Sequence, residues 1–406
     1  MIFSIKKKRI DFVIEYFPPD FAATGQLLDE LTLNLSKKGY SINVITSKNS
    51  QEISNQKKRK ENRKIFRIGF KRFNKNIKFS KYINSLLFCI SFTYRLIFSK
   101  NSPDILCFTT APPFQLIFSN IIHYFKNIPY IIIVYDIYPD LIYKLGYTNK
   151  NNLFIKIWER LNKLSYKNAN EIIVLSDNMK NTINAKLNGL NKKISVLSSW
   201  VNSKKIYPVE KDKNKFIKSN NLTNKFIVLY SGNQGRCHDL ITIFKVANFL
   251  KEDSKIVFLF IGNGAQHNTL KGLKQKWSLE NCIFLPYQEK NNLVFSLSSA
   301  DLAIVSLKKE ATDLVAPSKL YGHLACGTPV CTISSENSYL KTLIEEFELG
   351  KWVNNNNYKE IANWIIFIKN NPIIAKEIGL NCQKYFKHFA SLDVISRKYE
   401  EVLKKL

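Results

Sequence analysis

Residues 317–330 read Pro317-Ser318-Lys319-Leu320-Tyr321-Gly322-His323-Leu324-Ala325-Cys326-Gly327-Thr328-Pro329-Val330. The stretch places a lysine at the start of a predicted helix and a Gly-Thr-Pro-Val turn at its end. Ser318 has a side chain that can cap the helix, and Gly327 ends the helix before a short strand. Because a helix N-terminus carries free N–H groups and partial positive charge, this stretch predicts a phosphate site to which Lys319 adds a full charge. A capped surface helix with a solvated lysine is the alternative.

Short apolar segments alternate with longer amphipathic ones on both sides of this stretch. Such alternation is typical of α/β proteins in which helices cover both faces of a parallel sheet. We expect strands at residues 10–15, 41–46, 65–68, 105–108, 130–135, 171–175 and 194–197, and a second series at 226–230, 256–261, 282–285, 302–305 and 328–333. Helices are expected at residues 26–38, 82–98, 114–125, 155–165 and 177–187, between the strands of the second series, and as three helices in residues 355–406.

A chain of 406 residues is too long for one ordinary core, so two domains are expected. A polar run at residues 202–224 separates the two series and is typical of a domain junction. The predicted division is an N-terminal domain at 1–201, a linker at 202–224, a C-terminal domain at 225–385 and a final helix at 386–406.

The cysteines and the apolar segments indicate in which cellular compartment the protein is expected. The seven cysteines are scattered and odd in number, without a Cys-x-x-Cys pair, which indicates a reducing compartment and no structural metal. The basic N-terminus runs into the first predicted strand rather than into the apolar core of a signal peptide, so a cytoplasmic protein is expected. The longest apolar stretch, residues 83–98, contains Asn84 and Arg95 and is too short to span a bilayer, although it can lie on one.

Positive charge is concentrated near the N-terminus of a chain whose formal net charge is +29. Residues 1–100 hold 21 Lys and Arg against 7 Asp and Glu, and residues 57–81 hold 12 basic residues and one acid, Glu61. Such a patch attracts an anionic membrane surface or nucleic acid, and the chain lacks a recognised nucleic-acid motif. Codon composition is the alternative explanation, because Lys, Asn, Ile and Phe are all abundant.

The expected membrane contact is peripheral, on the inner face of the cytoplasmic membrane. It combines the basic segment, including Lys57, Lys58, Lys71 and Lys75, with the apolar run that follows it. The apolar side chains expected to insert are Leu86, Leu87, Phe88, Phe92 and Ile97. A helix that packs these side chains into the core is the alternative.

Two glycine-containing loops follow predicted strands, which is where open parallel sheets bind ligands. Residues 17–26 include Thr24 and Gly25, and residues 261–265 include Gly262. Small residues let backbone N–H groups approach an anion closely. Neither loop contains Gly-x-Gly-x-x-Gly followed by an acid about 20 residues later, which argues against a dinucleotide-dependent dehydrogenase.

A third loop, residues 231–240, combines glycines with charged side chains. Gly232 and Gly235 bring the main chain close to a ligand, and Arg236 offers a planar fork that matches phosphate oxygens. Asp239 can orient Arg236 or cap the next helix. The loop is therefore a second candidate for binding phosphate.

Two carboxylates, Asp136 and Asp140, follow the predicted strand at residues 130–135. Paired acids can serve acid/base catalysis, hold a metal or bind sugar hydroxyls. A turn with an aspartate at each side is the alternative.

Taken in order, these residues resemble the retaining glycosyltransferases of family 4, in particular the bacterial branch that builds capsule, O-antigen and exopolysaccharide. The resemblance covers nearly the whole chain. It rests on the motifs at residues 16–25, 136–140, 231–239 and 317–330.

The resemblance implies two Rossmann-like domains facing each other across a cleft. The N-terminal domain would bind the acceptor, a lipid-linked or other glycan, and the C-terminal domain would bind a nucleotide-sugar donor, without a metal cofactor. Lys319 and Arg236 would neutralise the diphosphate and Asp136 would contact the transferred sugar, which makes these three the expected catalytic residues. The expected donor-binding residues are Thr24, Gly25, Gly232, Asn233, Gly235, Asp239, Gly262, Pro286, Tyr287, Ser318 and Tyr321.

The sequence departs from the family pattern in one respect. Many members carry two glutamates separated by seven residues near the helix that starts at Lys319, whereas Leu314 and Gly322 stand at these places. Glu336, in the next loop, is the expected substitute near the nucleotide.

The function expected from these features is transfer of a sugar to a lipid-linked acceptor in the biosynthesis of cell-surface polysaccharides such as lipopolysaccharide and O-antigen. A sugar-nucleotide epimerase of similar two-domain shape and a non-catalytic polyanion-binding protein are the alternatives.

Overall fold

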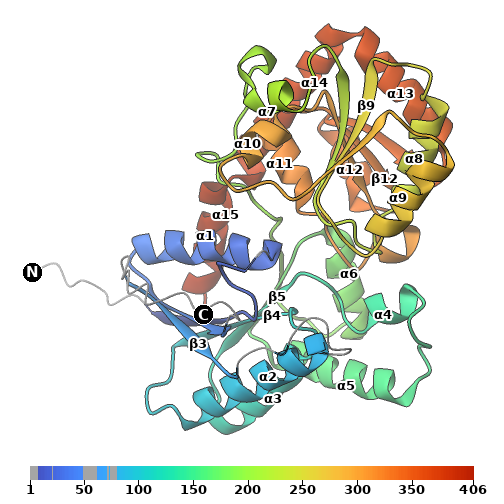
Figure 1. The fold of residues 1–406 in the computed structure, drawn as a ribbon. Coiled ribbons are helices and arrows are strands. Elements are labelled where there is room, and N and C mark those ends of the chain that lie inside the picture. The colour runs from blue at the N-terminus through green and yellow to red at the C-terminus, as the bar shows by residue number, and fades with distance from the viewer. Residues whose placement is uncertain (1–7, 21, 49–61, 71–72, 74–79) are drawn as a thin grey trace, which may run out of the picture. The chain divides into compact units, whose positions relative to one another are not determined.

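The computed structural model describes residues 8–20, 22–48, 62–70, 73 and 80–406. The chain divides into two compact units, each built around one parallel sheet (Figure 1). The first unit comprises Met1–Ser198 with Ile395–Leu406, and the second comprises Ser199–Val394. The segment at residues 202–224 groups with the second unit, and the end of the last helix returns to the first.

The described residues of the first unit form a sheet of seven parallel strands in the order β3-β2-β1-β4-β5-β6-β7. Its strands are β1 (Arg9–Val13), β2 (Ser41–Ser47), β3 (Arg63–Ile68), β4 (Ile105–Thr109), β5 (Tyr130–Val134), β6 (Glu171–Val174) and β7 (Ile194–Val196). The central strands β4 and β5 are buried along their whole length, because helices cover both faces of the sheet. The order reverses between β1 and β4, which is where ligands bind in such sheets.

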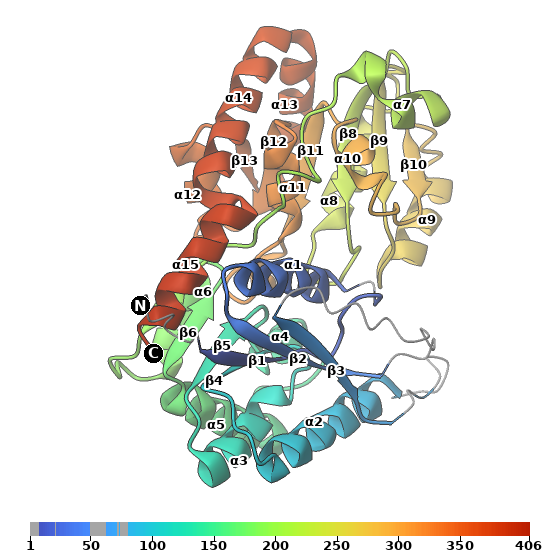
Figure 2. The same ribbon diagram turned by 90° about the vertical axis from the view of Figure 1, so that its left-hand side faces the viewer.

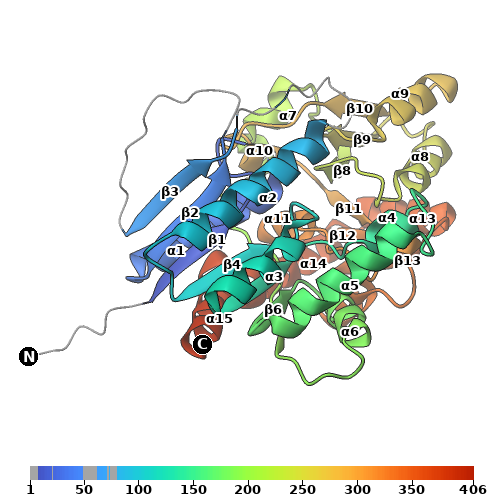
Figure 3. The ribbon, with the colours of Figure 1, turned by 90° about the horizontal axis from the view of Figure 1, so that it is seen from below.

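The helices of the first unit are α1 (Ala23–Lys37), α2 (Ser80–Phe98), α3 (Gln115–Lys126), α4 (Asp140–Lys144), α5 (Leu153–Asn168), α6 (Asp177–Lys186) and most of α15 (Leu392–Lys404). Helices α2, α3 and α5 lie side by side on one face of the sheet, and α1 covers the other (Figures 2 and 3). Helix α15 is fastened to α1 through the hydrogen bond from Ser396 to Asn34 (2.7 Å) and the ion pair of Lys38 with Glu400 (3.2 Å).

The described residues of the second unit form a sheet of six parallel strands in the order β10-β9-β8-β11-β12-β13. Its strands are β8 (Phe226–Ser231), β9 (Ile256–Ile261), β10 (Cys282–Leu285), β11 (Leu302–Ser306), β12 (Val330–Ser334) and β13 (Gly350–Asn354). Its α-helices are α7 (Lys215–Ser219), α8 (Leu240–Phe249), α9 (His267–Lys276), α10 (Leu293–Leu297), α11 (Lys319–Ala325), α12 (Tyr339–Glu346), α13 (Tyr358–Asn370) and α14 (Pro372–Tyr385).

The predicted fold class is confirmed: the chain contains two parallel α/β sheets and C-terminal helices. All twelve predicted strands are present, and the tail contains the three predicted helices α13, α14 and α15. Strand β13 was not predicted, because it is a short edge strand that begins with a glycine and a lysine. The short helices α4 and α7 were also not predicted, whereas α10 lies between β10 and β11, where a helix was expected.

The expected insertion of α2 into a membrane is wrong for two of its five named side chains. Phe88 and Phe92 are 2% and 0% exposed and pack in the core, and Phe92 lies 6.1 Å from the ring of Phe108 on β4. Leu87 and Ile97 are partly buried, and only Leu86 is exposed. The basic residues Lys57, Lys58, Lys71 and Lys75 lie outside the described residues. Within the part of the chain that is described, no helix is long and apolar enough to cross a membrane.

Candidate functional site

Three loops of the second unit meet at the edge of the sheet where β8, β9 and β10 end. Backbone hydrogen bonds fix their relative positions. The N–H of Gly232 donates to the carbonyl of Ile261 (2.9 Å), and that of Gly262 donates to the carbonyl of Leu285 (2.9 Å). Because parallel strands end at the same edge, loops that are far apart in sequence form one surface, which the start of α11 joins through Lys319.

The two glycines at this edge are required by backbone conformation and by close approach. Gly232 has φ of 131° and Gly262 has φ of 124°, which side-chain-bearing residues rarely adopt. A Cβ on Gly262 would lie 2.3 Å from the carbonyl oxygen of Gly232, and one on Gly232 would lie 3.3 Å from Cε of Lys319. These glycines therefore allow the loops to pack together beside the lysine.

Lys319 is the charged centre of this surface. Its Nζ lies 2.5 Å from the hydroxyl of Tyr230, 3.4 Å from the carbonyl oxygen of Asn233 and 3.4 Å from Nε2 of His238. The ammonium also lies 3.9 Å from the centroid of the Tyr230 ring. Among the residues that the structure describes, no carboxylate forms a salt bridge with it.

Desolvation lowers the pKa of Lys319 from 10.5 to about 7, because the charged form loses hydration without gaining a counter-anion. A phosphate placed beside the ammonium would supply the missing negative charge and would raise this pKa again. The arrangement is therefore suited to an anionic ligand.

His238 is buried, and its Nε2 atom lies next to the ammonium of Lys319. Its Nδ1 lies 2.6 Å from the carbonyl oxygen of Ser306. Because a carbonyl can only accept a hydrogen bond, Nδ1 carries the proton and the lone pair of Nε2 faces Lys319. Burial and the neighbouring Lys319 lower the pKa of His238 to about 3, so the ring is neutral at physiological pH.

Sequence reasoning did not assign a role to His238 or Tyr230. His238 lies in the candidate loop and Tyr230 directly precedes it, but their partner Lys319 is 81 and 89 residues away, so only the fold reveals the contact. The hydroxyl of Tyr230 also donates to the carbonyl of Asn233 (2.8 Å), which ties the loop to the strand that precedes it.

The remaining predicted residues of the loop at 231–240 lie around Lys319. The side chains of Arg236 and Asn233 are exposed, and Gly235 is buried. Asp239 caps α8, since its carboxylate accepts from the N–H (3.2 Å) and the hydroxyl (2.8 Å) of Thr242. Of the two roles considered for Asp239, the structure shows the helix cap.

The predicted cap at Ser318 is wrong. Ser318 occupies the N-cap position of α11, but its side chain makes no cap hydrogen bond. The reason is its helical backbone, with φ of −60° and ψ of −22°, whereas capping residues are typically extended. The predicted end of the helix is confirmed, since Gly327 adopts φ of 69° directly after Cys326 at the C-cap.

Other predicted donor-binding residues differ in accessibility. Pro286 and Tyr287 are exposed after β10, and the hydroxyl of Tyr287 donates to the carbonyl of Asn263 (3.0 Å). Tyr321 is buried within α11. Glu336 is exposed and forms an ion pair with Lys341 (3.4 Å).

The predicted residues of the first unit are either buried or partly exposed. Gly25 is required for packing, because a Cβ there would lie 2.1 Å from the carbonyl oxygen of Tyr16. Asp140 is buried, pairs with Lys186 (2.8 Å) and accepts from the hydroxyl of Tyr143 (2.7 Å). Thr24 and Asp136 are partly exposed at the start of α1 and after β5.

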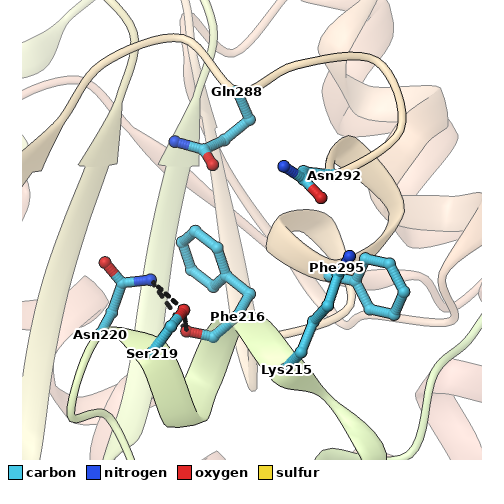
Figure 4. A pocket seen from close by; sticks show the side chains of 7 residues that line it. All are labelled: Lys215, Phe216, Ser219, Asn220, Gln288, Asn292 and Phe295. Carbon is cyan, nitrogen blue, oxygen red and sulfur yellow. Dashed lines mark hydrogen bonds between the residues drawn. The ribbon is translucent and has the colours of Figure 1, made fainter.

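A cavity of about 280 Å³ lies elsewhere in the second unit, between α7 and α10 (Figure 4). Its polar side chains include Gln288 and Asn292, and Lys215 lies 4.4 Å from the centroid of the Phe295 ring. Sequence reasoning singled out none of these residues. Within the described part of the chain, no group of three His, Cys, Asp or Glu residues is arranged to hold a metal ion.

Comparisons with known proteins identify the family to which the chain is similar. Residues 211–385 match the family model described as "Glycosyl transferases group 1", and residues 24–205 match "Glycosyltransferase Family 4". The chain is 24% identical to a probable glycosyltransferase, WbjE of Pseudomonas aeruginosa, over 349 residues that cover 84% of each protein. A putative colanic acid biosynthesis glycosyl transferase, WcaI of Escherichia coli K12, is 34% identical over 124 residues, 30% of each protein.

Solved structures show the same fold at low sequence identity. Sucrose-phosphate synthase from Thermosynechococcus elongatus has a TM-score of 0.79 with 16% identity, covering 98% of this chain and 99% of that one. WaaG, a glycosyltransferase involved in lipopolysaccharide biosynthesis, has a TM-score of 0.72 with 11% identity and coverage of 97% and 99%. Anabaena HepE in complex with UDP-glucose has a TM-score of 0.72 with 14% identity and coverage of 98% and 100%. The fold is thus the GT-B fold.

Proposed function

This chain belongs to the family 4 glycosyltransferases, and we propose that it transfers a sugar from a nucleoside-diphosphate donor to a glycan acceptor with retention of configuration. In this reaction the bond between the anomeric carbon and the diphosphate breaks, the oxygen of an acceptor hydroxyl forms the new bond, and the proton of that hydroxyl passes to the departing diphosphate. The departing diphosphate carries the developing negative charge. Positive groups positioned beside it lower the barrier.

The observation that supports this proposal most is the ammonium of Lys319, which is held by neutral partners at the carboxyl edge of the sheet. A diphosphate would supply its counter-charge. Arg236, exposed in the neighbouring loop, is proposed to bind the same group through its planar fork. Two fixed cations can thus stabilise the leaving group.

Asp136 is proposed to contact the transferred sugar. It is partly exposed after β5, whereas Asp140 is buried and pairs with Lys186. A carboxylate can accept hydrogen bonds from sugar hydroxyls. The other proposed donor contacts are those named from the sequence: Thr24, Gly25, Gly232, Asn233, Gly235, Asp239, Gly262, Pro286, Tyr287, Ser318, Tyr321 and Glu336.

We propose a UDP-sugar as the first donor to test, because HepE has been solved with UDP and with UDP-glucose. The proposed acceptor is a lipid-linked glycan of a cell-surface polysaccharide, in line with the names of WcaI and WaaG. Such an acceptor is presented at the cytoplasmic face of a membrane, where we place the enzyme.

A panel of UDP-, GDP-, dTDP- and ADP-sugars tests the proposal. Thermal shift identifies the donor, because a ligand that binds only the folded state raises its stability in proportion to affinity. Release of nucleoside diphosphate, accelerated by a glycan acceptor, supports glycosyl transfer. Interconversion of the free nucleotide sugar would instead identify an epimerase, and neither binding nor turnover with any donor would favour a non-catalytic polyanion-binding protein.

A further inference from the structure

Helix α2 is apolar on two sides. Its inner side contributes the core residues Phe88, Phe92 and Leu96. Its outer side exposes an apolar residue at every fourth position, namely Tyr82, Leu86, Ile90, Tyr94 and Phe98. Residues four apart are neighbours on a helix surface, so these side chains form a continuous ridge. An ordinary surface helix would carry polar residues there.

The two neighbouring helices continue this apolar surface. Helix α3, which lies between α2 and α5 (Figure 3), exposes Tyr124 and Phe125, with 83% and 63% of their surface accessible. Helix α5 exposes Leu153, Ile157 and Leu164. We call the outer sides of α2, α3 and α5 the three-helix surface. Large apolar side chains exposed together on neighbouring helices are typical of sites of interaction.

The charges on the three-helix surface have one sign. Helices α2 and α3 contain no Asp or Glu, and the one acid of α5, Glu159, forms an ion pair with Lys186. Basic and apolar side chains alternate along the exposed side of α5. Residues three or four apart share one side of a helix, and the exposed residues at this spacing are Ile157, Arg160, Leu164 and Lys167. Lysines and arginines interleaved with apolar and aromatic residues are typical of helices that lie in a membrane interface.

We propose that the three-helix surface docks this enzyme in the interfacial region of an anionic lipid leaflet. Tyrosine suits this position, because its ring enters the acyl boundary while its hydroxyl stays among the headgroups. A second copy of the chain is a poorer partner, since a two-fold interface would place the same basic side chains opposite each other. An anionic leaflet neutralises them.

This surface differs from the one that the sequence suggested. The insertion expected there used Leu86, Leu87, Phe88, Phe92 and Ile97, of which Phe88 and Phe92 are core residues and only Leu86 is exposed. The outer ridge of α2 and the contributions of α3 and α5 become visible only when the helices are packed on the sheet. The proposal goes beyond glycosyl transfer, because it concerns a surface of the first unit that contains none of the proposed donor-binding residues.

Vesicle sedimentation of the full chain tests the proposal. The wild-type protein should bind phosphatidylglycerol-containing vesicles strongly and pure phosphatidylcholine vesicles weakly. An apolar variant combines Ile90→Ser, Tyr94→Ser, Tyr124→Ser and Phe125→Ser. A charge variant combines Lys156→Gln, Arg160→Gln and Lys167→Gln, and should lower the partition coefficient on the order of 100-fold, since each basic residue near the surface contributes about 1 kcal/mol.

Matched controls change similar residues of the second unit. The apolar control combines Phe249→Ser, Ile373→Ser and Leu380→Ser, and the charge control combines Lys218→Gln, Lys251→Gln and Lys276→Gln, all at exposed positions. Both controls should bind vesicles like the wild-type protein. Circular dichroism and the thermal shift with nucleoside diphosphate should be unchanged in all variants, which separates a failure of docking from a failure of the proposed donor site.

Three outcomes would overturn the proposal. They are equal binding to neutral and anionic vesicles, wild-type binding by the apolar and charge variants, and equal loss of binding in the controls. If the apolar variant instead converts a wild-type dimer to a monomer in sedimentation velocity without changing vesicle binding, the surface is an interface between two copies.

Discussion

The Nε2 atom of His238 lies 3.4 Å from the Nζ atom of Lys319, while Nδ1 of the same ring donates to the carbonyl of Ser306. The backbone at the end of β11 thus fixes the ring that positions the lysine. Because Tyr230 and Asn233 complete this environment with neutral oxygens, the ammonium remains available to an anion.

Lys319→Ala and Arg236→Ala should each lower the rate of transfer by two to three decades. Each removes charge proposed to face the departing diphosphate, and loss of one such contact typically costs about 3 kcal/mol. Steady-state kinetics with the donor found by thermal shift measures the effect, with Lys271→Ala, an exposed lysine on α9, as control. Near-normal turnover in both site variants would contradict the site assignment.

His238 should act as a positioning residue for Lys319. His238→Ala removes the acceptor that faces the ammonium, so we expect a fall of at least about tenfold in kcat/KM, as for loss of a hydrogen bond to a charged group. His238→Gln can donate to Ser306 and accept from Lys319 and should restore most of the activity. If the glutamine variant is as impaired as the alanine variant although both are equally stable, the proposed geometry is wrong.

Affinity for nucleoside diphosphate should fall as pH rises above 7. The pKa of Lys319 is lowered to about 7 in the free protein, and a bound diphosphate raises it. Above pH 7 the complex therefore holds more protons than the free protein, so binding takes up a proton. The association constant for the diphosphate then falls by at most tenfold per pH unit. Below this pKa, Lys319 is protonated in both the free and the bound protein, so its titration no longer changes the affinity.

Calorimetry in buffers of different ionisation enthalpy measures this uptake. At pH 7.5 the wild-type protein should take up a fraction of a proton. Lys319→Arg should take up almost none, because arginine stays charged. Equal uptake by both proteins would assign the proton to another group.

Sequence patterns located the strands because buried strands are short apolar runs between turn residues, as at Tyr130–Val134. They identified the loops that we propose bind phosphate because glycines and cations follow those strands. They could not divide the apolar residues of α2 into an inner and an outer side, since Phe88 and Ile90 are equally apolar and only packing separates them. His238 belongs to the motif at residues 231–239, but its role could not be assigned, because that role depends on a contact between residues 81 positions apart.

Transfer should continue in the presence of EDTA. Asp136 and Asp140 are four residues apart and so do not form an Asp-x-Asp pair, and Asp140 already pairs with Lys186. We propose that Lys319 and Arg236 neutralise the diphosphate in place of a divalent ion. The rate with and without chelator is compared under the same conditions. Loss of activity that manganese or magnesium restores would contradict this expectation.

The two aspartates after β5 should respond differently to the same substitution. Asp140→Asn replaces a buried carboxylate that Lys186 and Tyr143 both contact, so it should lower the free energy of unfolding by about 1–3 kcal/mol. Asp136→Asn changes a partly exposed side chain and should leave stability nearly unchanged while reducing transfer by at least about tenfold. Denaturant unfolding and initial rates, measured on both variants, separate the effects. A stable Asp140→Asn protein, or a fully active Asp136→Asn protein, would show that the roles of these carboxylates are not divided in this way.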